Sequence, residues 1–246
     1  MVSLKVTTQP VCEPVSLDTV KNHLKVSYSD DDSLIAIYIQ AAREWCESYV
    51  NRSFIKKTYQ MTLAWLPLFD YRQQGSGQGT APNPGWYNGL WVADSLKIKL
   101  LRPNLIPGSS TIAYADLSGN TQTLHESNND YQVNPYSEPS LIMPKSGVFW
   151  PWTQYSNPTA VKITYDAGSG DETAIQAAIH GSPAVSEVTA RQAAVPGWVK
   201  LAILQLVGHW YEHRESVSEL NLKEVPLGIK NIIGMYCVDD FAPTNG

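Results

Sequence analysis

The stretch Gly197-Trp-Val-Lys-Leu-Ala-Ile-Leu-Gln-Leu-Val-Gly-His-Trp-Tyr-Glu-His-Arg-Glu215, near the C-terminus, has the pattern of a helix with one buried face. Pro196, directly before it, suits the first turn of a helix. Large apolar side chains then recur at the spacing of one helical face: Val199, Ile203, Leu206, Val207 and Trp210. Such a helix needs a second apolar surface to cover this face.

A second helix, predicted over Leu34–Tyr49, supplies that surface. Three aspartates at positions 30–32 precede it and favour a helix start through capping and the helix dipole. About 20 residues would make a rod of roughly 30 Å. Its expected apolar stripe is Leu34, Tyr38, Ala41, Trp45 and Tyr49, widened by Ile35, Ala42 and Cys46, with Arg43, Glu44 and Glu47 outside it.

Two shorter helices complete the helical part. Ser16 is a good N-cap for a helix that carries Val20 and Leu24 on one face. Near the other end of the chain, 226–234 predicts a last short helix that presents three isoleucines.

Between the helices the sequence alternates with the period of β-strands. Leu96, Ile98 and Leu100 point to one face, with Lys97 and Lys99 on the other. A Ser-Gly turn signal within 116–120 predicts a hairpin. The expected strands are 58–65, 96–100, 111–115, 121–124, 131–133, 140–142 and 160–165.

The order helix, helix, strands, helix, helix predicts an α+β fold. We expect the N- and C-terminal helices to form a four-helix bundle that carries an inserted antiparallel β domain. The polar tail Val238–Gly246 and the first ten residues are expected to be arms that become ordered on a neighbour. The predicted domains are 1–56 (first helical half), 57–194 (β domain, with long loops at 73–89 and 168–194) and 195–246 (second helical half and C-terminal arm).

Composition restricts the function. The 246 residues carry a net charge of −5, which disfavours a general nucleic-acid-binding surface and suits a wall that repels phosphate. Three widely spaced cysteines indicate neither a disulfide framework nor a cysteine zinc site. The sequence has no signal-peptide core and no apolar run of 18 residues, so we expect no membrane span.

His209, Glu212 and His213 form the H-x-x-E-H pattern of one class of zinc protease. A catalytic zinc usually needs a third protein ligand, and the acidic residues downstream, Glu219 and Glu224, lie in a short linker. The pattern is also that of a charged, solvated helix end, where His213 and the following arginine complement the dipole. We therefore predict no metal, no cofactor and no catalytic residue, with a zinc hydrolase as the alternative.

The segments Glu13–Ile55 and Val195–Tyr236 resemble the two halves of phage head–tail connector (adaptor) proteins. The resemblance rests on Glu13-Pro-Val-Ser-Leu-Asp, Asp30-Asp-Asp-Ser-Leu-Ile, Ala41-Ala-Arg-Glu-Trp-Cys-Glu-Ser-Tyr and Val195-Pro-Gly-Trp-Val-Lys-Leu-Ala-Ile, in this order. The β portion is similar in pattern to the longer variety of the family, which carries such an insert.

The resemblance implies a non-enzymatic virion protein, assembled in the host cytoplasm and located in the neck between head and tail. It implies a ring, commonly of about twelve subunits, under the portal protein. This ring would extend the channel for viral DNA without sequence-specific binding, and would dock the next neck, stopper or tail protein. The alternatives are a tail-completion (stopper) ring protein and, for the β domain, a carbohydrate-binding module with Trp86, Trp91, Trp150 and Trp152 as sugar platforms.

Overall fold

The computed structural model describes residues 2–67, 96–154, 156–213 and 227–237. It confirms the predicted α+β class with antiparallel sheets. The chain divides into two compact units, which we call the β unit (Met1–Thr7 and Thr58–Asp166) and the helical unit (Thr8–Lys57 and Ala167–Gly246). The predicted long loop at 73–89 and the C-terminal arm from Val238 lie outside the described residues.

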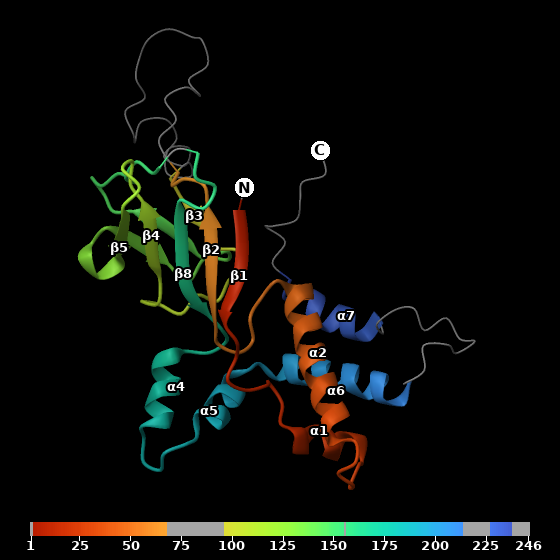
Figure 1. Cartoon of the computed structure of the whole chain (residues 1–246). Helices are drawn as coiled ribbons and strands as arrows, with labels where there is room; N and C mark the ends of the chain where they lie inside the picture. The colour runs from red at the N-terminus through yellow and green to blue at the C-terminus, as the bar shows by residue number, and fades with distance from the viewer. Residues whose placement is uncertain (1, 68–95, 155, 214–226, 238–246) are drawn as a thin grey trace. The chain divides into compact units, whose positions relative to one another are not determined.

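The β unit contains two sheets (Figure 1). Strand pairs β4–β5, β4–β8, β3–β7 and β6–β7 are antiparallel. A short 3₁₀ turn, η2 (Glu126–Asn128), follows β5. The five-stranded sheet has the order β1 (Val2–Thr8), β2 (Lys57–Leu63), β8 (Val161–Ala167), β4 (Thr111–Ala115) and β5 (Thr121–His125), and the three-stranded sheet β3 (Ile98–Lys99), β7 (Leu141–Pro144) and β6 (Tyr131–Asn134).

Alternating apolar residues position these strands as the sequence predicts. Along β8 the side chains of Val161, Ile163 and Tyr165 are buried, while those between them are more exposed. The β4–β5 hairpin turns at 116–120, where Asp116 Oδ1 accepts hydrogen bonds from the backbone N–H groups of Ser118 and Asn120, both 2.9 Å. These bonds give the turn a local cause that is independent of the rest of the sheet.

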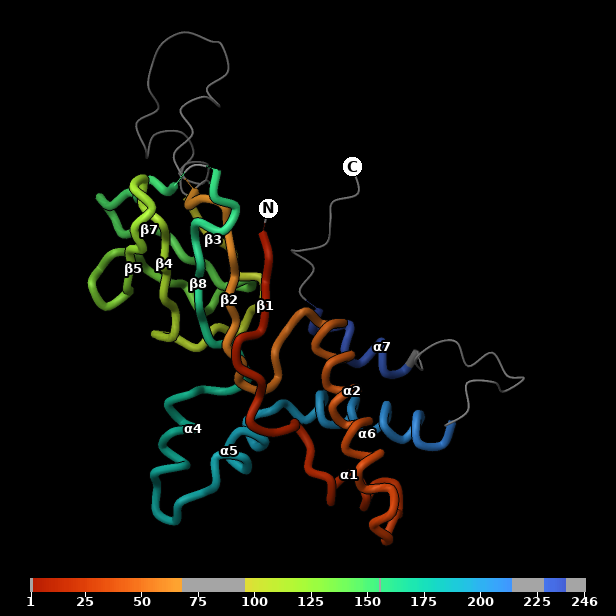
Figure 2. Tube along the Cα trace, in the orientation of Figure 1, coloured from red at the N-terminus to blue at the C-terminus, as the bar shows by residue number. Residues whose placement is uncertain are grey.

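The N-terminal residues, expected to be an arm, form a strand of the five-stranded sheet in this structure. Val2–Thr8 forms β1 at the edge of the five-stranded sheet, beside β2 (Figure 2). Its sequence, Val-Ser-Leu-Lys-Val-Thr-Thr, is rich in β-branched residues and has no proline, which favours a strand. The residues that follow β1 belong to the helical unit, and the chain passes between the two units three times, after Thr7, Lys57 and Asp166.

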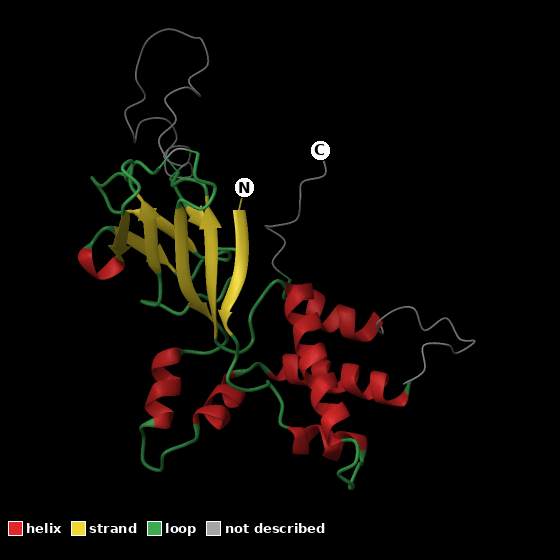
Figure 3. Cartoon of the chain, in the orientation of Figure 1, coloured by secondary structure: helices red, strands yellow, loops and turns green. Residues whose placement is uncertain are grey.

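The helical unit is built from two segments far apart in the sequence, and its helices are drawn red in Figure 3. Helix α2 (Asp32–Val50) packs against α6 (Gly197–Glu212), and both contact α1 (Leu17–Leu24) and α7 (Leu227–Gly234). Ser16 caps α1 as predicted, accepting a hydrogen bond of 3.2 Å from the Thr19 N–H. The core of the unit includes Val20, Ile35, Ile39, Ala42, Cys46, Val50, Val199, Ala202, Ile203, Leu206, Val207, Ile229 and Ile233. Within the described residues, no helix is long and apolar enough to cross a membrane.

The buried face of α2 is rotated from the predicted stripe. Its centre runs through Ile35, Ile39, Ala42 and Cys46, whereas Tyr49 is 38% exposed. Two apolar rows lie side by side on this helix. The row of aliphatic residues and Cys46 is buried, and the row with Tyr38, Trp45 and Tyr49 lies at its edge.

The segment 168–194, predicted as a long loop, contains two helices, α4 (Glu172–Ile179) and α5 (Glu187–Ala194). The sequence 171–179 has the pattern of a short helix within that segment, and α4 lies there, whereas no pattern predicted α5. Ser186 N-caps α5 by accepting a hydrogen bond from the Thr189 N–H. Asp171 N-caps α4 by accepting one from the Thr173 N–H. The apolar pattern of α5 is weak, and its stability depends on the ion pairs described below.

Gly168 is required where the chain leaves β8, which gives a testable expectation. A Cβ atom on Gly168 would lie 2.7 Å from the Lys56 nitrogen and 2.8 Å from its Cα, both backbone atoms. We expect Gly168→Ala to lower the free energy of unfolding by about 1–3 kcal/mol, as overpacking does. Urea denaturation measures this change.

The matched control is Gly197→Ala at the start of α6, where an added Cβ meets nothing within 4 Å. There alanine should be neutral, or stabilising by up to about 1 kcal/mol, because it restricts the unfolded chain. Equal stability of the two variants would contradict the close approach of the backbone at Gly168.

Candidate functional site

The H-x-x-E-H residues lie at the C-terminal end of α6. His209 is half-buried, whereas Glu212 and His213 are exposed, and the two imidazole rings stand edge to face with centroids 4.9 Å apart. The His213 N–H donates to the His209 carbonyl oxygen at 3.1 Å and caps the helix. In the part of the chain that the structure describes, no three His, Cys, Asp or Glu side chains are grouped so as to hold a metal ion. Glu219 and Glu224 lie outside that part.

The same end of α6 is held to the start of α2. The Tyr211 hydroxyl donates to Asp31 Oδ2 at 2.6 Å, and the Tyr28 hydroxyl lies 3.0 Å from the Tyr211 hydroxyl. These hydrogen bonds raise the pKa of Tyr211 above the ordinary range of a phenol, because the neutral hydroxyl donates to a carboxylate. Beside them, Tyr38 and Trp210 pack with ring centroids 6.3 Å apart. The arrangement fixes the helix end and presents no reactive group.

A buried ion cluster lies on α2, at charged residues that the sequence pattern placed outside the apolar stripe. Arg43 and Glu47 are only 2% and 4% exposed. Arg43 donates to Glu47 Oε2 at 3.0 Å and to Glu13 Oε2 at 2.7 Å, and Lys57 pairs with Glu47 Oε2. The other Glu47 oxygen accepts from the Phe54 N–H at 2.9 Å.

The charges in this cluster compensate one another. Burial alone would lower the pKa of Arg43, but the hydrogen bond to Glu13 and the charge of Glu47 raise its pKa above the ordinary value. The cluster therefore joins α2 to the segments that precede α1 and follow α2. Its position indicates a structural role in the helical unit.

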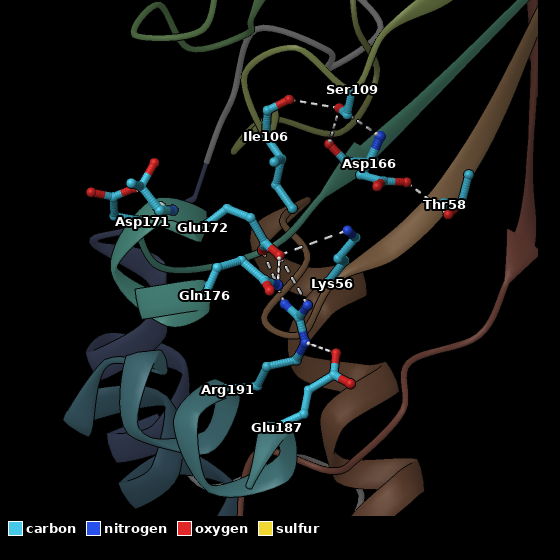
Figure 4. A network of polar contacts seen from close by, with 11 residues as sticks. Lys56, Thr58, Ile106, Ser109, Asp166, Asp171, Glu172, Gln176, Glu187 and Arg191 are labelled. Carbon is cyan, nitrogen blue, oxygen red and sulfur yellow. Dashed lines mark hydrogen bonds and ion pairs between the residues drawn. The ribbon is translucent and has the colours of Figure 1, made fainter. Parts of the chain in front are cut away.

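A second cluster joins α4 to α5 (Figure 4). The Arg191 guanidinium makes two hydrogen bonds of 3.1 Å with the Glu172 carboxylate and one of 2.7 Å with Glu187. Gln176 donates to Glu172 at 2.8 Å, and the Lys56 ammonium lies 3.8 Å from it. Burial alone would raise the pKa of Glu172, but the hydrogen bonds from Arg191 and Gln176 outweigh burial and lower its pKa. This bidentate pairing explains why a weakly patterned segment is helical.

A group of aromatic rings surrounds the C-terminal end of α7. Trp198 and Tyr236 are stacked with centroids 4.1 Å apart, and Phe54 meets Trp198 edge to face at 5.9 Å. Arg52 Nε donates to the Tyr236 carbonyl oxygen at 3.0 Å. Met235 is nevertheless 77% exposed. The group anchors the chain directly before residue 238 and leaves apolar surface beside it.

Of the four tryptophans proposed as sugar platforms, the structure describes Trp150 and Trp152. Trp150 is 3% exposed, and its indole N–H donates to the Leu96 carbonyl oxygen at 2.8 Å. Trp152 is 58% exposed, and Trp86 and Trp91 lie outside the described residues. Trp150 therefore belongs to the core of the β unit, which contradicts its predicted role as a platform.

Polar contacts also fix the end of β8 within the β unit (Figure 4). Asp166 Oδ1 accepts from the Thr58 hydroxyl at 2.7 Å, and the Asp166 N–H donates to the Ser109 hydroxyl at 3.1 Å. These contacts join residues more than 50 positions apart, so no local pattern could predict them. The Arg43–Glu47 pair did carry a signal, the i, i+4 spacing of opposite charges, but spacing alone does not reveal burial.

One family of known proteins matches part of this chain. The sequence profile of the phage gp6-like head-tail connector protein family matches residues 14–77, which include α1, α2 and β2. None of the curated protein sequences that were compared matches the chain.

Solved structures with a similar fold come from gene transfer agent (GTA) particles. A chain from the neck of an empty GTA particle, computed with C6 symmetry, aligns with a TM-score of 0.61 and 14% identity, over 96% of this chain and 95% of that one. A chain from the neck of the native particle, computed with C12 symmetry, aligns with a TM-score of 0.59 and 15% identity over the same shares. The predicted resemblance to the head–tail connector family is confirmed by the sequence match over residues 14–77. The similarity to the GTA neck chains is one of fold, and it extends over nearly the whole chain.

Proposed function

We propose that this protein is a structural head–tail connector of a virion neck. In this proposal its copies form a ring under the portal, extend the channel for viral DNA and dock the next connector or tail protein. The observation that carries it is the family match over α1 and α2, on a chain whose whole fold is similar to chains of a neck. Necks computed with C6 and C12 symmetry support copies arranged around an axis.

The helical unit suits the rigid part of such a ring. We propose that α1, α2, α6 and α7 act as one four-helix bundle and that the β domain is a module inserted into it. Exposed apolar side chains of this unit, among them Ile37 on α2, Leu201 on α6 and Met235 directly after α7, are candidates for contacts between copies. The net charge of −5 suits a channel through which DNA must pass freely, because a negative wall repels phosphate.

The proposed role is non-enzymatic and needs no metal or cofactor. His209 and His213 would then contribute at an interface or a helix end. The tail Val238–Gly246, outside the described residues, is proposed to reach the portal, because the aromatic group around Tyr236 anchors the chain directly before it.

Mass photometry and negative-stain imaging of the full chain, alone and with the portal protein of the same virion, test the ring. We expect a closed ring, either alone or on the portal. Deleting residues 238–246 should leave the fold intact and reduce the fraction of rings attached to portal. A chain that stays monomeric in both conditions would overturn the proposal, and unchanged attachment would reject the role of the tail.

A further inference from the structure

We propose that strand β1 is exchanged between neighbouring copies, so that in the assembled ring Val2–Thr8 of one chain pairs with β2 of the next. The inference rests on the proposed ring and names the contact that links its copies. The occupant of the β2 edge is then β1 of a second copy of this chain.

The first observation is that side chains contribute little to holding β1. All of its residues except Leu4 are exposed, and Val2 and Val6 are 51% and 36% exposed. Its attachment includes backbone pairing with β2 and a hydrogen bond of 3.1 Å from the Thr7 hydroxyl to the Thr58 carbonyl oxygen. Backbone hydrogen bonds are independent of which chain supplies the strand.

The second observation is the path of the chain. β1 pairs with a strand that begins about fifty residues later, and the intervening residues belong to the helical unit. β1 is therefore connected to the rest of the β unit by pairing and not by a turn. An element connected in this way can be exchanged between identical copies at low cost.

The third observation is the linker. Glu13 is fixed by its ion pair with Arg43, and Pro14 and Val15 are buried, so the chain is held in the helical unit from residue 13 onward. Only Gln9–Cys12 lies between this anchor and β1, and Val11 there is 60% exposed. Pro10 favours an extended linker, because its ring fixes φ.

Exchange preserves every contact that the single chain makes. The β2 edge that receives a neighbour's β1 is the edge that binds β1 in this structure, so its complementarity is already present. In a head-to-tail ring each copy gives one strand and receives one, so every edge is filled and the ring closes. The effective concentration of β1 decides between pairing within one chain and pairing between chains.

A mixed-ring crosslink tests the exchange. Cys12→Ser and Cys237→Ser remove two native thiols, whereas Cys46 stays because it is fully buried and burial raises its pKa to about 12. One full-length variant then carries Thr7→Cys and a second carries Thr58→Cys. They are mixed before ring assembly, with portal if the ring requires it, and treated with a short bifunctional maleimide.

We expect a crosslinked heterodimer on a denaturing gel. Its yield should exceed that of random collisions by about a hundredfold, since an interface holds its residues at millimolar effective concentration. The matched control is the pair Thr111→Cys and Thr164→Cys, which face each other on β4 and β8 within one unit. Mixed rings of these two variants should give no heterodimer, while the variant with both changes should link within its own chain.

The outcomes separate the two proposals. Heterodimer from Thr7→Cys and Thr58→Cys in rings supports exchange. A variant that carries both Thr7→Cys and Thr58→Cys completes the test. If rings form without heterodimer and this variant is crosslinked only within its own chain, exchange is overturned and the proposed ring still stands. Failure to form rings with or without portal overturns the proposed function and the exchange together.

Discussion

Glu47→Ala will destabilise the helical unit by about 3–5 kcal/mol, the usual loss when one partner of a buried ion pair is removed. The carboxylate of Glu47 accepts from Arg43 and Lys57, and it also accepts from the Phe54 N–H. Without it, Lys57 and the Phe54 N–H lose this buried acceptor, and Arg43 keeps only its bonds to Glu13 and Glu44. The free energy of unfolding from urea denaturation, followed by circular dichroism, measures the effect.

Glu44→Ala is the matched control. Glu44 also pairs with Arg43, at 3.3 Å, but it is 54% exposed on the same helix. Because solvent screens an exposed pair, we expect a loss of at most about 1 kcal/mol. If the two alanine variants were equally stable, the cluster around Glu47 would not be the buried network that the structure shows.

Leu206→Ala will remove about 2–5 kcal/mol from the free energy of unfolding. Leu206 is fully buried on α6, in the core shared with α2. The loss combines the transfer of the deleted methyl and methylene groups with the cavity that they leave. The same urea titration measures it.

Leu201→Ala makes the same chemical change on the same helix at a position that is 45% exposed. We expect it to alter stability by no more than about 0.5–1 kcal/mol, as surface substitutions usually do. A large loss at Leu201 and none at Leu206 would mean that α6 presents the opposite face to α2. Under the proposed function, Leu201→Ala is also the variant in which a ring defect would appear without unfolding.

Sequence pattern predicted well the elements whose cause is local. The helical spacing around Ile203 and Leu206 placed α6 correctly, and the Ser-Gly signal placed the β4–β5 hairpin. Each of these elements has its period, cap or turn within a few residues, so neighbouring sequence is enough to identify it.

Elements that depend on distant partners were missed. β1 is a strand because β2 accepts it, and α5 is helical in part because Arg191 binds Glu172 from α4. The burial of Arg43 and Glu47 likewise depends on Lys57 and Glu13, which lie 14 and 30 positions from Arg43. Such contacts leave no periodic trace in the sequence.

The candidate site was only partly predictable. The pattern at His209, Glu212 and His213 named the right residues at a helix end, but it did not reveal that His213 caps the helix or that Tyr211 is bound by Asp31. The stacking of Tyr236 on Trp198 was not foreseen, because it joins the two C-terminal helices through space.

The pairing of α2 with α6 has a consequence for synthesis in the cell. Domains usually fold as they emerge, but these two helices are separated by about 150 residues, or roughly 7–30 s of translation. During that interval the apolar face through Ile35, Ile39 and Cys46 has no partner, while the whole β unit has already been made. The helical unit is therefore completed last. For most of its synthesis, a nascent chain of this protein exposes the apolar face of α2 to chaperones or to other nascent copies.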